Sequence, residues 1–229
     1  MLQLQNLKAR NIFTLIFLMF GILGLYVQLS RLGYTVPLNL IPDVFCLKGC
    51  STPANLHQVT PEDRLLTEGD AISNLLKSAN FEPNKVSLLV EKSKFKLTVF
   101  FDGQPVKSYP MVLGGNPVGD KRKEGDRKTP EGIFTIQDIY PHPQWSSFFW
   151  IDYPTPESWR KHLKAKWNGE ISWFDRVGSE VGIHGVPAGA NSWIDTGTNW
   201  TWGCVSLKNE DIEELDRILQ VGTPIEIIP

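Results

Sequence analysis

The stretch "VSLLVEKSKFKLTVFFDGQPVKSYPMVLG", residues 86–114, predicts the fold class of this chain. Apolar and polar residues alternate along it, and β-branched and aromatic side chains are frequent, as is typical of strands. Two turn signals, "KSK" at 92–94 and "DG" at 102–103, divide it into consecutive hairpin strands. We therefore expect antiparallel β-structure to begin near Val86.

Further strands and a few helices are predicted downstream of this stretch. Strand-like patterns recur in "GIFTIQDIY" (132–140), "VGIHG" (181–185), "VSL" (205–207) and "PIEIIP" (224–229). Residues 141–175 mix strand-like and loop-like pieces with many aromatic residues, and a helix is expected over about 208–220. Residues 86–229 are thus expected to form one mostly β domain with a few helices.

An apolar segment near the N-terminus predicts a membrane anchor. "NIFTLIFLMFGILGLYVQLS", residues 11–30, carries no charge, and an apolar helix needs roughly 20 residues to cross a bilayer. A cleaved signal peptide would end in small residues, which "LYVQLSRLG" lacks. Lys8 and Arg10 give a slight basic excess before the segment, which favours a cytoplasmic N-terminus. We expect residues 1–10 in the cytoplasm, 11–30 as a signal anchor and the rest outside the cytoplasmic membrane.

Two connecting segments are expected between this anchor and the β domain. Residues 31–60 contain many Pro, Gly and Ser residues and are interpreted as a stalk. Residues 61–80 are interpreted as a helical lead-in, because Thr60 is a suitable N-cap and proline follows at the first helical position.

Composition and cysteine usage exclude several classes of protein. A hydrophobic content of 41% and a formal net charge of −2 indicate a globular chain without the basic excess of a nucleic-acid-binding protein. Of the three cysteines, Cys46 and Cys50 in "CLKGC" could form a disulfide outside the cytoplasm. No second ligand pair has the spacing of a metal site, so neither a metal nor a cofactor is expected. Cys204 is left as an unpaired thiol.

Two interpretations of Cys204 follow from general chemistry. A free cysteine is most often a small buried hydrophobe, whereas a nucleophilic cysteine needs a nearby base, usually histidine. His57, His142 and His162 are most simply exposed residues. His184 differs because it ends a predicted strand and is followed at once by Gly185.

The segments around His184 and Cys204 resemble a known family. "IHG" at 183–185 followed by "TWGC" at 201–204 resembles the histidine–glycine and Ser/Thr–any–Gly–Cys pattern of the L,D-transpeptidases with a YkuD-type catalytic domain. "GDRKTPEGIFTI" (125–136), "FFWIDYP" (148–154) and "GTPIEIIP" (222–229) are similar to further family segments in the same order. The resemblance therefore covers residues 86–229.

One departure from the family pattern concerns the residue two positions after the cysteine. Many members carry arginine there, whereas this chain has Ser206. The segment looks like a subgroup with a "DWTxGCIAL"-like motif, with Asn199 in place of the aspartate. The missing guanidinium leaves nucleophile and base in place but leaves the substrate and the acceptor open.

The resemblance implies a fold and a set of site residues. The expected fold is an L,D-transpeptidase-type β-sandwich or open barrel behind an N-terminal transmembrane helix. Cys204 is implied as the nucleophile and His184 as its base, with the backbone N–H groups of Gly203 and Cys204 as the oxyanion hole. Supporting roles are expected for Thr201, Gly185 and Ser206. Substrate contacts are expected from Trp150, Tyr153 and Trp202.

The resemblance also implies substrate and location. Peptidoglycan stem peptides are the expected substrate of a bacterial inner-membrane protein that crosses the membrane once and exposes its catalytic domain to the periplasm or cell-wall space. The implied function is a peptidoglycan L,D-transpeptidase that acts through a cysteine acyl-enzyme on the stem tetrapeptide and passes the acyl group to an amine acceptor. The alternatives are a peptidoglycan L,D-hydrolase that uses the same Cys–His site and an inactive membrane-tethered wall-binding module.

Two more expectations concern segments around this site. The aromatic residues of 145–173 are expected to wall the cleft over Cys204. The basic run at residues 121–128 is expected to be a solvated loop, with contact to anionic wall polymers as the alternative. "GGNPVGDK" (114–121) lacks the Gly-Lys-Ser/Thr ending of a phosphate-binding loop.

Overall fold

The computed structural model describes residues 2–47, 49–50, 55–57, 65–66, 72 and 81–229. The predicted lead-in helix at 61–80, with its N-cap Thr60, lies mostly outside these residues. Its described member Ile72 is buried, with 1% of its surface exposed.

One eight-stranded sheet dominates the domain, in the strand order β3-β2-β1-β8-β4-β5-β6-β7. The strands are β1 Val86–Glu91, β2 Lys96–Phe101, β3 Gln104–Pro110, β4 Gly132–His142, β5 Ser146–Ile151, β6 Gly182–His184, β7 Val205–Ser206 and β8 Pro224–Ile228. The pairs β1–β8 and β6–β7 are parallel, and the other neighbouring pairs are antiparallel. The hairpins predicted from residues 86–114 are therefore present.

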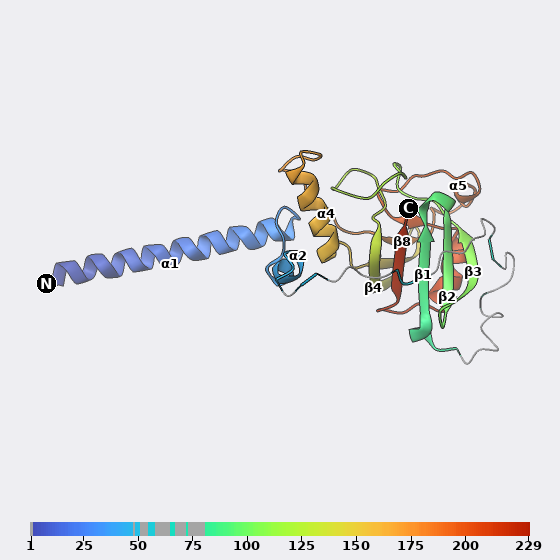
Figure 1. The fold of residues 1–229 in the computed structure, drawn as a ribbon, viewed down its shortest axis with the longest axis horizontal. Coiled ribbons are helices and arrows are strands. Elements are labelled where there is room, and N and C mark those ends of the chain that lie inside the picture. The colour runs from blue at the N-terminus through green and yellow to red at the C-terminus, as the bar shows by residue number, and fades with distance from the viewer. Residues whose placement is uncertain (1, 48, 51–54, 58–64, 67–71, 73–80) are drawn as a thin grey trace.

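The sheet is curled rather than flat. The first part of β4 pairs with β8 and its second part with β5, with a register shift between Ile136 and Asp138. The chain after β3 returns to the far edge, where Val112 forms a bridge with Ser206 of β7. The result is a mostly β, half-barrel-like domain with few helices, which confirms the predicted fold class (Figure 1).

The core lies between the curled sheet and the segments that cover it. Leu88 and Val90 of β1 and Leu97 of β2 are fully buried and pack with Ile212 and other apolar residues in one cluster. Ile212 belongs to α6, Asn209–Asp216, close to the predicted C-terminal helix. Burial of each such side chain stabilises the fold by about 1.5–3 kcal/mol.

Besides the 3-10 turn η3, Lys92–Lys94, two other α-helices lie among residues 86–229. The longer one is α4, Pro156–Trp167, which was not predicted within the mixed segment 141–175. Its start follows the usual rules, because the side chain of Thr155 accepts a hydrogen bond from Ser158 N and proline occupies the first turn. The short α5, Ser192–Asp195, precedes the cysteine loop.

The N-terminal helix α1, Leu2–Arg31, extends away from the domain (Figure 1). Its window Thr14–Arg31 has a mean hydropathy of 1.6 and is not buried, so it is a candidate membrane span by length and composition. The segment that follows, expected as a stalk, includes the helical turns η1, Leu38–Leu40, and α2, Ile41–Val44. The structure also joins Cys46 and Cys50 in a disulfide.

The connecting segment packs on the domain at several points. Val36 and Val44 belong to the main core cluster, and Val177 N donates a hydrogen bond to Gly33 O at 3.0 Å. Further along, His57 is buried, and its Nδ1 and Nε2 atoms lie 2.9 Å from Glu226 Oε2 and 2.8 Å from Ser87 Oγ. Residues 33–47 and 57 are thus held against the folded domain.

The expectation that His57 and His162 are exposed is wrong. Both are buried, at 8% and 1% exposure. His162 lies on α4 with its Nδ1 2.6 Å from Arg122 O, and desolvation by burial lowers the pKa of its ring below the ordinary value. Both histidines pair with groups far away in the sequence, which is why local pattern did not identify them.

Candidate active site

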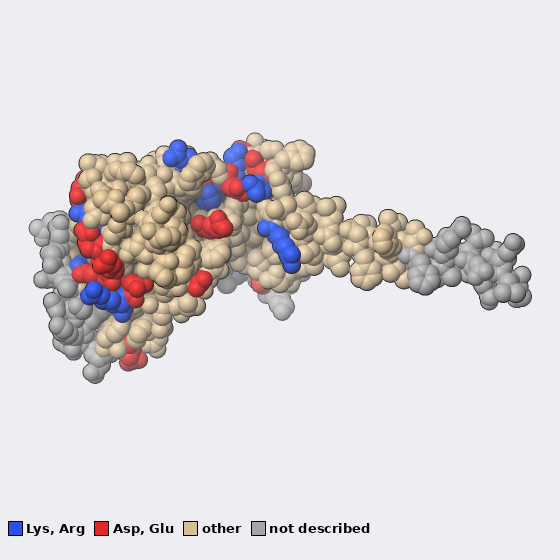
Figure 2. All heavy atoms as spheres, turned by 180° about the vertical axis from the view of Figure 1, so that it is seen from behind, with Lys and Arg blue, Asp and Glu red and all other residues tan. Residues whose placement is uncertain are grey.

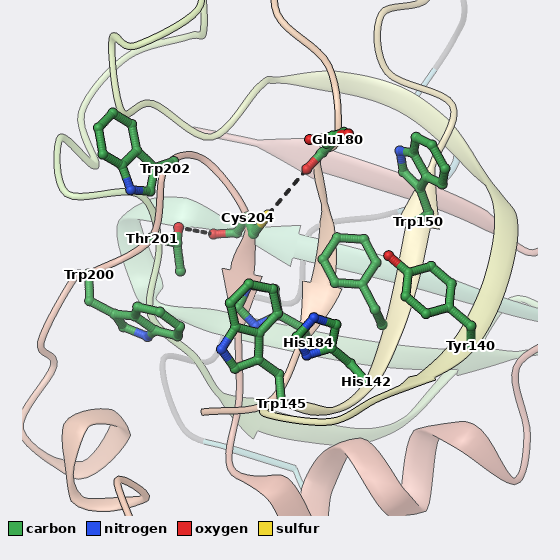
Figure 3. Close-up of a pocket in the computed structure, with 11 residues that line it drawn as sticks. Tyr140, His142, Trp145, Trp150, Glu180, His184, Trp200, Thr201, Trp202 and Cys204 are labelled. Atoms are coloured by element: carbon green, nitrogen blue, oxygen red, sulfur yellow. Dashed lines mark hydrogen bonds between the residues drawn. The ribbon is translucent and has the colours of Figure 1, made fainter. Parts of the chain in front are cut away.

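His184 and Cys204 face one cavity of about 470 Å³ (Figure 3). His184 ends β6, and Cys204 directly precedes β7. Because β6 and β7 pair in parallel, with Ile183 opposite Val205 and His184 opposite Ser206, the two side chains are brought to the same edge of the sheet. The cavity is lined by Tyr140, His142, Trp145, Phe148, Trp150, Glu180, His184, Trp200, Thr201, Trp202 and Cys204.

His184 is fixed in one tautomer by its own backbone neighbour. Its Nδ1 atom lies 2.7 Å from Gly185 O. A carbonyl oxygen only accepts, so Nδ1 must carry the proton, and Nε2 of the neutral ring keeps a free lone pair. The ring is 2% exposed and stacks on Trp145 and Phe148, with ring centroids at 4.5 and 5.5 Å. Desolvation by burial lowers the pKa of His184 to about 4, so the ring is a neutral base near pH 7.

Gly185 and Ser206 hold the His184 ring in place on the side away from the cavity. Ser206 is fully buried, and its hydroxyl donates a hydrogen bond of 3.2 Å to Gly185 O, the carbonyl that also accepts from His184. A Cβ atom on Gly185 would overlap Asn209 Oδ1, so no larger residue fits. The Ser206 side chain therefore points toward Gly185 O, the carbonyl that fixes His184, and does not line the cavity.

The turn that carries Cys204 is held by Thr201. The Thr201 hydroxyl donates to Cys204 O at 2.7 Å and accepts from Gly203 N at 3.2 Å. Gly203 has a φ of +138°, and a Cβ atom there would lie 2.7 Å from Lys128 O, so both dihedral and space require glycine. Among the hydrogen bonds of the described residues, Cys204 N–H has no acceptor, whereas Gly203 N–H is engaged by Thr201.

The thiol of Cys204 is in its protonated form in this structure's environment. Its Sγ donates a weak contact to Glu180 O at 3.7 Å. Burial raises the pKa of the Cys204 thiol to about 11, although a backbone hydrogen bond from Gly182 and the charge of Lys121 oppose the rise. At rest the site therefore holds a thiol and a neutral imidazole that line the same cavity, and among the hydrogen bonds of the described residues none joins the two side chains.

A second cavity of about 210 Å³ touches Cys204 from another side, and Lys121 lines it together with Gly203. Lys121 is 5% exposed, and its Nζ lies 2.9 Å from Asp126 Oδ1. A Cβ atom on Gly203 would lie 3.5 Å from that Nζ, which places the ammonium beside the cysteine turn.

Asp126 organises the loop that brings Lys121 there. Its carboxylate accepts backbone N–H groups from Arg122, Lys123 and Lys128. Burial raises the pKa of Asp126, but Lys121 and these N–H groups outweigh it and hold that pKa below its ordinary value. The expectation that residues 121–128 form a solvated loop is therefore wrong for Lys121 and Asp126.

Aromatic side chains form most of the cavity wall (Figure 3). Trp150 and Tyr140 lie on one side of Cys204, and Trp200 and Trp202 on the other. Trp202 is 72% exposed, and the guanidinium of Arg127 lies 5.5 Å from its ring centroid. Trp150 and Trp202 thus line the cavity, and the substrate contacts expected of them stay predictions.

Other aromatic residues predicted for the cleft lie elsewhere. Tyr153 is buried in the core, where its hydroxyl donates to Val177 O at 3.0 Å, so the predicted substrate contact is wrong. Trp159 is buried on α4, and Trp167 and Trp173 are exposed without lining the cavity. Only the first part of the aromatic segment 145–173 walls the cleft.

Sequence reasoning missed several residues that shape the site. His142, expected to be exposed, lines the cavity and stacks on Trp145 at 4.1 Å. Asn199 accepts from Leu113 N at 2.8 Å through its side-chain oxygen, a role that an aspartate could also fill. Lys121 was hidden in a run of charges, where one buried lysine has no local signal.

Comparisons with known proteins follow this geometry. A sequence model described as the L,D-transpeptidase catalytic domain (YkuD) matches residues 85–227. No curated protein matches the chain.

Several solved structures are similar to this one. Bd1075 of Bdellovibrio bacteriovorus is 27% identical, with 63% of this chain and 48% of that chain covered and a TM-score of 0.43. An L,D-transpeptidase from Mycobacterium smegmatis is 17% identical, with 63% and 59% covered and a TM-score of 0.41. The helical cell shape determining protein Pgp2 from Campylobacter jejuni is 20% identical, with 68% and 54% covered and a TM-score of 0.44. The match spans about half the length of these solved chains.

Proposed function

The chain belongs to the L,D-transpeptidase catalytic-domain family, and on that premise we propose that it is a peptidoglycan L,D-transpeptidase that acts on stem tetrapeptides through a cysteine acyl-enzyme. The observation that carries this proposal is the cavity shared by His184 and Cys204, in which Nδ1–H is held by Gly185 O and Nε2 is left as a base. The catalytic domain works outside the cytoplasmic membrane, with α1 as a single-pass anchor.

The first half-reaction forms a thioester. Nε2 of His184 takes the proton from Sγ of Cys204, and the sulfur attacks the carbonyl carbon of the third stem-peptide residue. The carbon–nitrogen bond to the fourth residue, D-alanine, then breaks, and the imidazolium returns its proton to the leaving amine. Burial raises the pKa of the thiol and lowers the pKa of the histidine, so the resting pair is uncharged and the proton must move from Sγ to Nε2 for the sulfur to attack.

The negative oxygen of the tetrahedral intermediate needs donors that are already in place. Cys204 N–H, which has no acceptor among the described residues, donates to it. Gly203 N–H joins when it leaves the Thr201 hydroxyl, 3.2 Å away. Loss of one such donor typically costs about 100- to 1000-fold in rate. The Lys121 ammonium adds positive charge beside the same turn.

The second half-reaction releases the acyl group. An amine of a neighbouring stem peptide attacks the thioester, His184 takes the proton from that amine, and the thiol is restored. If water takes the place of the amine, the same site acts as a peptidoglycan L,D-hydrolase. Where many family members carry an arginine, this chain has Ser206, whose hydroxyl bonds to Gly185 O behind His184. No guanidinium at this position is available to bind a carboxylate of the substrate, so substrate recognition depends on the aromatic side chains of the cavity wall.

One incubation tests the proposal. The full chain in detergent is mixed with tetrapeptide-bearing muropeptides, and the products are identified by mass spectrometry. Cross-linked dimers with loss of D-alanine support the transpeptidase, and tripeptides without dimers assign the hydrolase. If the muropeptides are unchanged while Cys204 is intact and the protein is folded, both the transpeptidase and the hydrolase assignment are wrong. The remaining interpretation is then an inactive wall-binding module.

A further inference from the structure

Several of the most exposed aromatic side chains have no role in the active site. Phe174, Trp167 and Trp173 are 87%, 81% and 61% exposed, and Phe45 is 58% exposed with Leu47 beside it at 69%. Of the described residues outside α1, only Trp202 is an aromatic residue of comparable exposure. Exposed apolar side chains of this size that gather on one part of a soluble domain mark an interaction surface.

These residues lie at the end of the domain from which α1 leaves. Trp173 and Phe174 belong to the loop after α4, and Trp167 is the last residue of α4. Phe45 and Leu47 directly follow α2. Figure 1 shows α2 and the loop after α4 on opposite sides of the C-terminal end of α1. We call the five residues the α1-side face.

The junction between α1 and the domain is fixed by several contacts. The hydroxyl of Tyr26 in α1 donates to the carbonyl oxygen of Val36, in the segment that follows α1, at 2.6 Å. Val177 N donates to Gly33 O at 3.0 Å, and the Arg176 guanidinium lies 5.9 Å from the ring centroid of Tyr34. The direction of α1 therefore determines how the α1-side face is presented.

A second set of contacts ties the two sides of the face together. Arg160 of α4 donates to Asp43 O of α2 at 2.8 Å. Val44 of α2 is buried in the main core cluster. The helices α2 and α4, which the two parts of the α1-side face follow, are therefore held together beside the end of α1.

The chemistry of this face fits the membrane–water interface. Tryptophan is enriched at that interface because its ring is apolar and its N–H remains polar. Exposed Lys164 lies in the last turn of α4, close to Trp167, and suits anionic headgroups. Figure 2 shows the largest group of acidic residues of the visible face on the side away from α1, whereas exposed Glu170 lies in the loop between Trp167 and Trp173.

We propose that the α1-side face inserts into the interface of the bilayer that α1 spans, so that the domain lies on the membrane surface in one orientation. The proposal rests on the membrane placement of α1 given above. Trp167, Trp173 and Phe174 enter on one side of α1, and Phe45 and Leu47 on the other.

This orientation also places the active site relative to the membrane. A cavity of about 380 Å³ between the end of α1 and the domain is lined in part by Arg31 and Glu180. Glu180 also lines the two cavities that reach Cys204. Glu180 thus borders both the cavity at the end of α1 and the two cavities at Cys204, and the α1-side face would fix the distance of this region from the bilayer.

Quenching of tryptophan fluorescence by brominated lipid tests the proposal. The chain has eight tryptophans, and none of them lies in α1, so contact with lipid reports on the domain alone. The full chain is reconstituted into phosphatidylcholine vesicles whose acyl chains carry bromine near the headgroups, and its emission is compared with that in unbrominated vesicles. We expect partial quenching of the wild-type protein and loss of that quenching in the double variant Trp167→Phe, Trp173→Phe.

The matched control is Trp202→Phe, which removes an equally exposed tryptophan at the cavity and should leave the quenching unchanged. Vesicle flotation shows that each protein is membrane-bound, and near-ultraviolet circular dichroism shows that it is folded. If the double variant does not fold, the two single variants must each lose part of the quenching. Equal quenching in the wild-type and tryptophan variants, or none in floated wild-type protein, overturns the proposal. No step depends on turnover, so an inactive enzyme would still give the expected quenching.

Discussion

The histidine side of the cavity and its cysteine side are built from different chemistry. His184 is 2% exposed and stacks between aromatic rings, and its polar partner is a single carbonyl. Cys204 borders a polar loop in which buried Lys121 pairs with Asp126 at 2.9 Å. The apolar side keeps the imidazole neutral, and the polar side places a positive charge near the cysteine turn. In the proposed mechanism, each side would therefore prepare one partner of the proton transfer.

The largest expected effect is loss of the nucleophile. Cys204→Ala should abolish turnover, since removing the nucleophile of a comparable catalytic unit costs about 10⁶-fold in kcat. In the wild-type protein Cys204 should be acylated by carbapenem-type β-lactams, and mass spectrometry of the intact chain detects the added mass. An adduct that persists in Cys204→Ala would place the nucleophile elsewhere. Cys204→Ser separates loss of sulfur from loss of volume.

The aromatic side should make folding stability depend on pH through His184. In the unfolded chain the ring takes a proton near pH 6.5, whereas the folded ring takes one only near pH 4. Between these pH values the unfolded state binds more protons than the folded state. The contribution of His184 to the free energy of unfolding is therefore complete above pH 6.5 and decreases as the pH falls toward 4. The full loss is about 3 kcal/mol.

Denaturant unfolding of wild type and His184→Gln at pH 7 and pH 4.5 measures this dependence. The variant should lose most of the difference between the two pH values. His162 remains in both proteins, and since its pKa is also lowered by burial, it contributes the same background. Equal pH dependence in the two proteins would mean that His184 is not held neutral by its surroundings.

The polar side should affect the rate through Lys121. We expect Lys121→Met to lower kcat by about 10- to 100-fold, or about 1.4–2.7 kcal/mol, because it removes the charge beside the oxyanion. Lys121→Arg should recover part of the loss. The control is Lys123→Met in the same loop, which removes a partly exposed ion pair with Asp175. Equal effects of the two methionine variants on kcat would assign Lys121 to loop structure alone.

Ser206 tests the support behind the histidine. Ser206→Ala removes one of two donors to Gly185 O, and a lost hydrogen bond of this kind is worth about 0.5–1.5 kcal/mol. We expect a several-fold lower kcat and a displaced acidic limb in the pH–rate profile. The control is Ser108→Ala, an equally buried hydroxyl that bonds to Thr98 in the sheet far from the cavity. If both variants lose stability and neither changes the pH profile, Ser206 does not position the base.

The sequence predicts the strands and the His184–Cys204 pair, but not the buried Lys121–Asp126 pair on the polar side of the cavity. Strand alternation identifies the hairpins from Val86 onward, and the motif identifies His184 and Cys204, since each depends on local pattern. Lys121 becomes buried only because Asp126 gathers the backbone of its loop, which no period or motif encodes. The pair of His57 and Glu226 joins positions 169 residues apart. Contacts of such separation follow from the tertiary fold, and α4 shows that local helix signals are easily overlooked in an aromatic-rich segment.

The smallest expected effect concerns Trp202, which lies over the polar side. Its ring is 72% exposed and contacts the Arg127 guanidinium, so it offers a flat apolar surface at the cavity edge without touching the proton-transfer pair. A contact of this kind is equally strong in the ground state and the transition state, which raises KM when it is lost and leaves kcat unchanged. We expect Trp202→Ala to raise KM for muropeptides several-fold and Trp202→Phe to keep most of the affinity, because stacking needs a ring and not the indole N–H. Steady-state kinetics on both variants measures this split. A lower kcat at constant KM would instead place Trp202 among the groups that act in the transition state. Aromatic side chains would then contribute to catalysis on the Cys204 side of the cavity as well as on the His184 side.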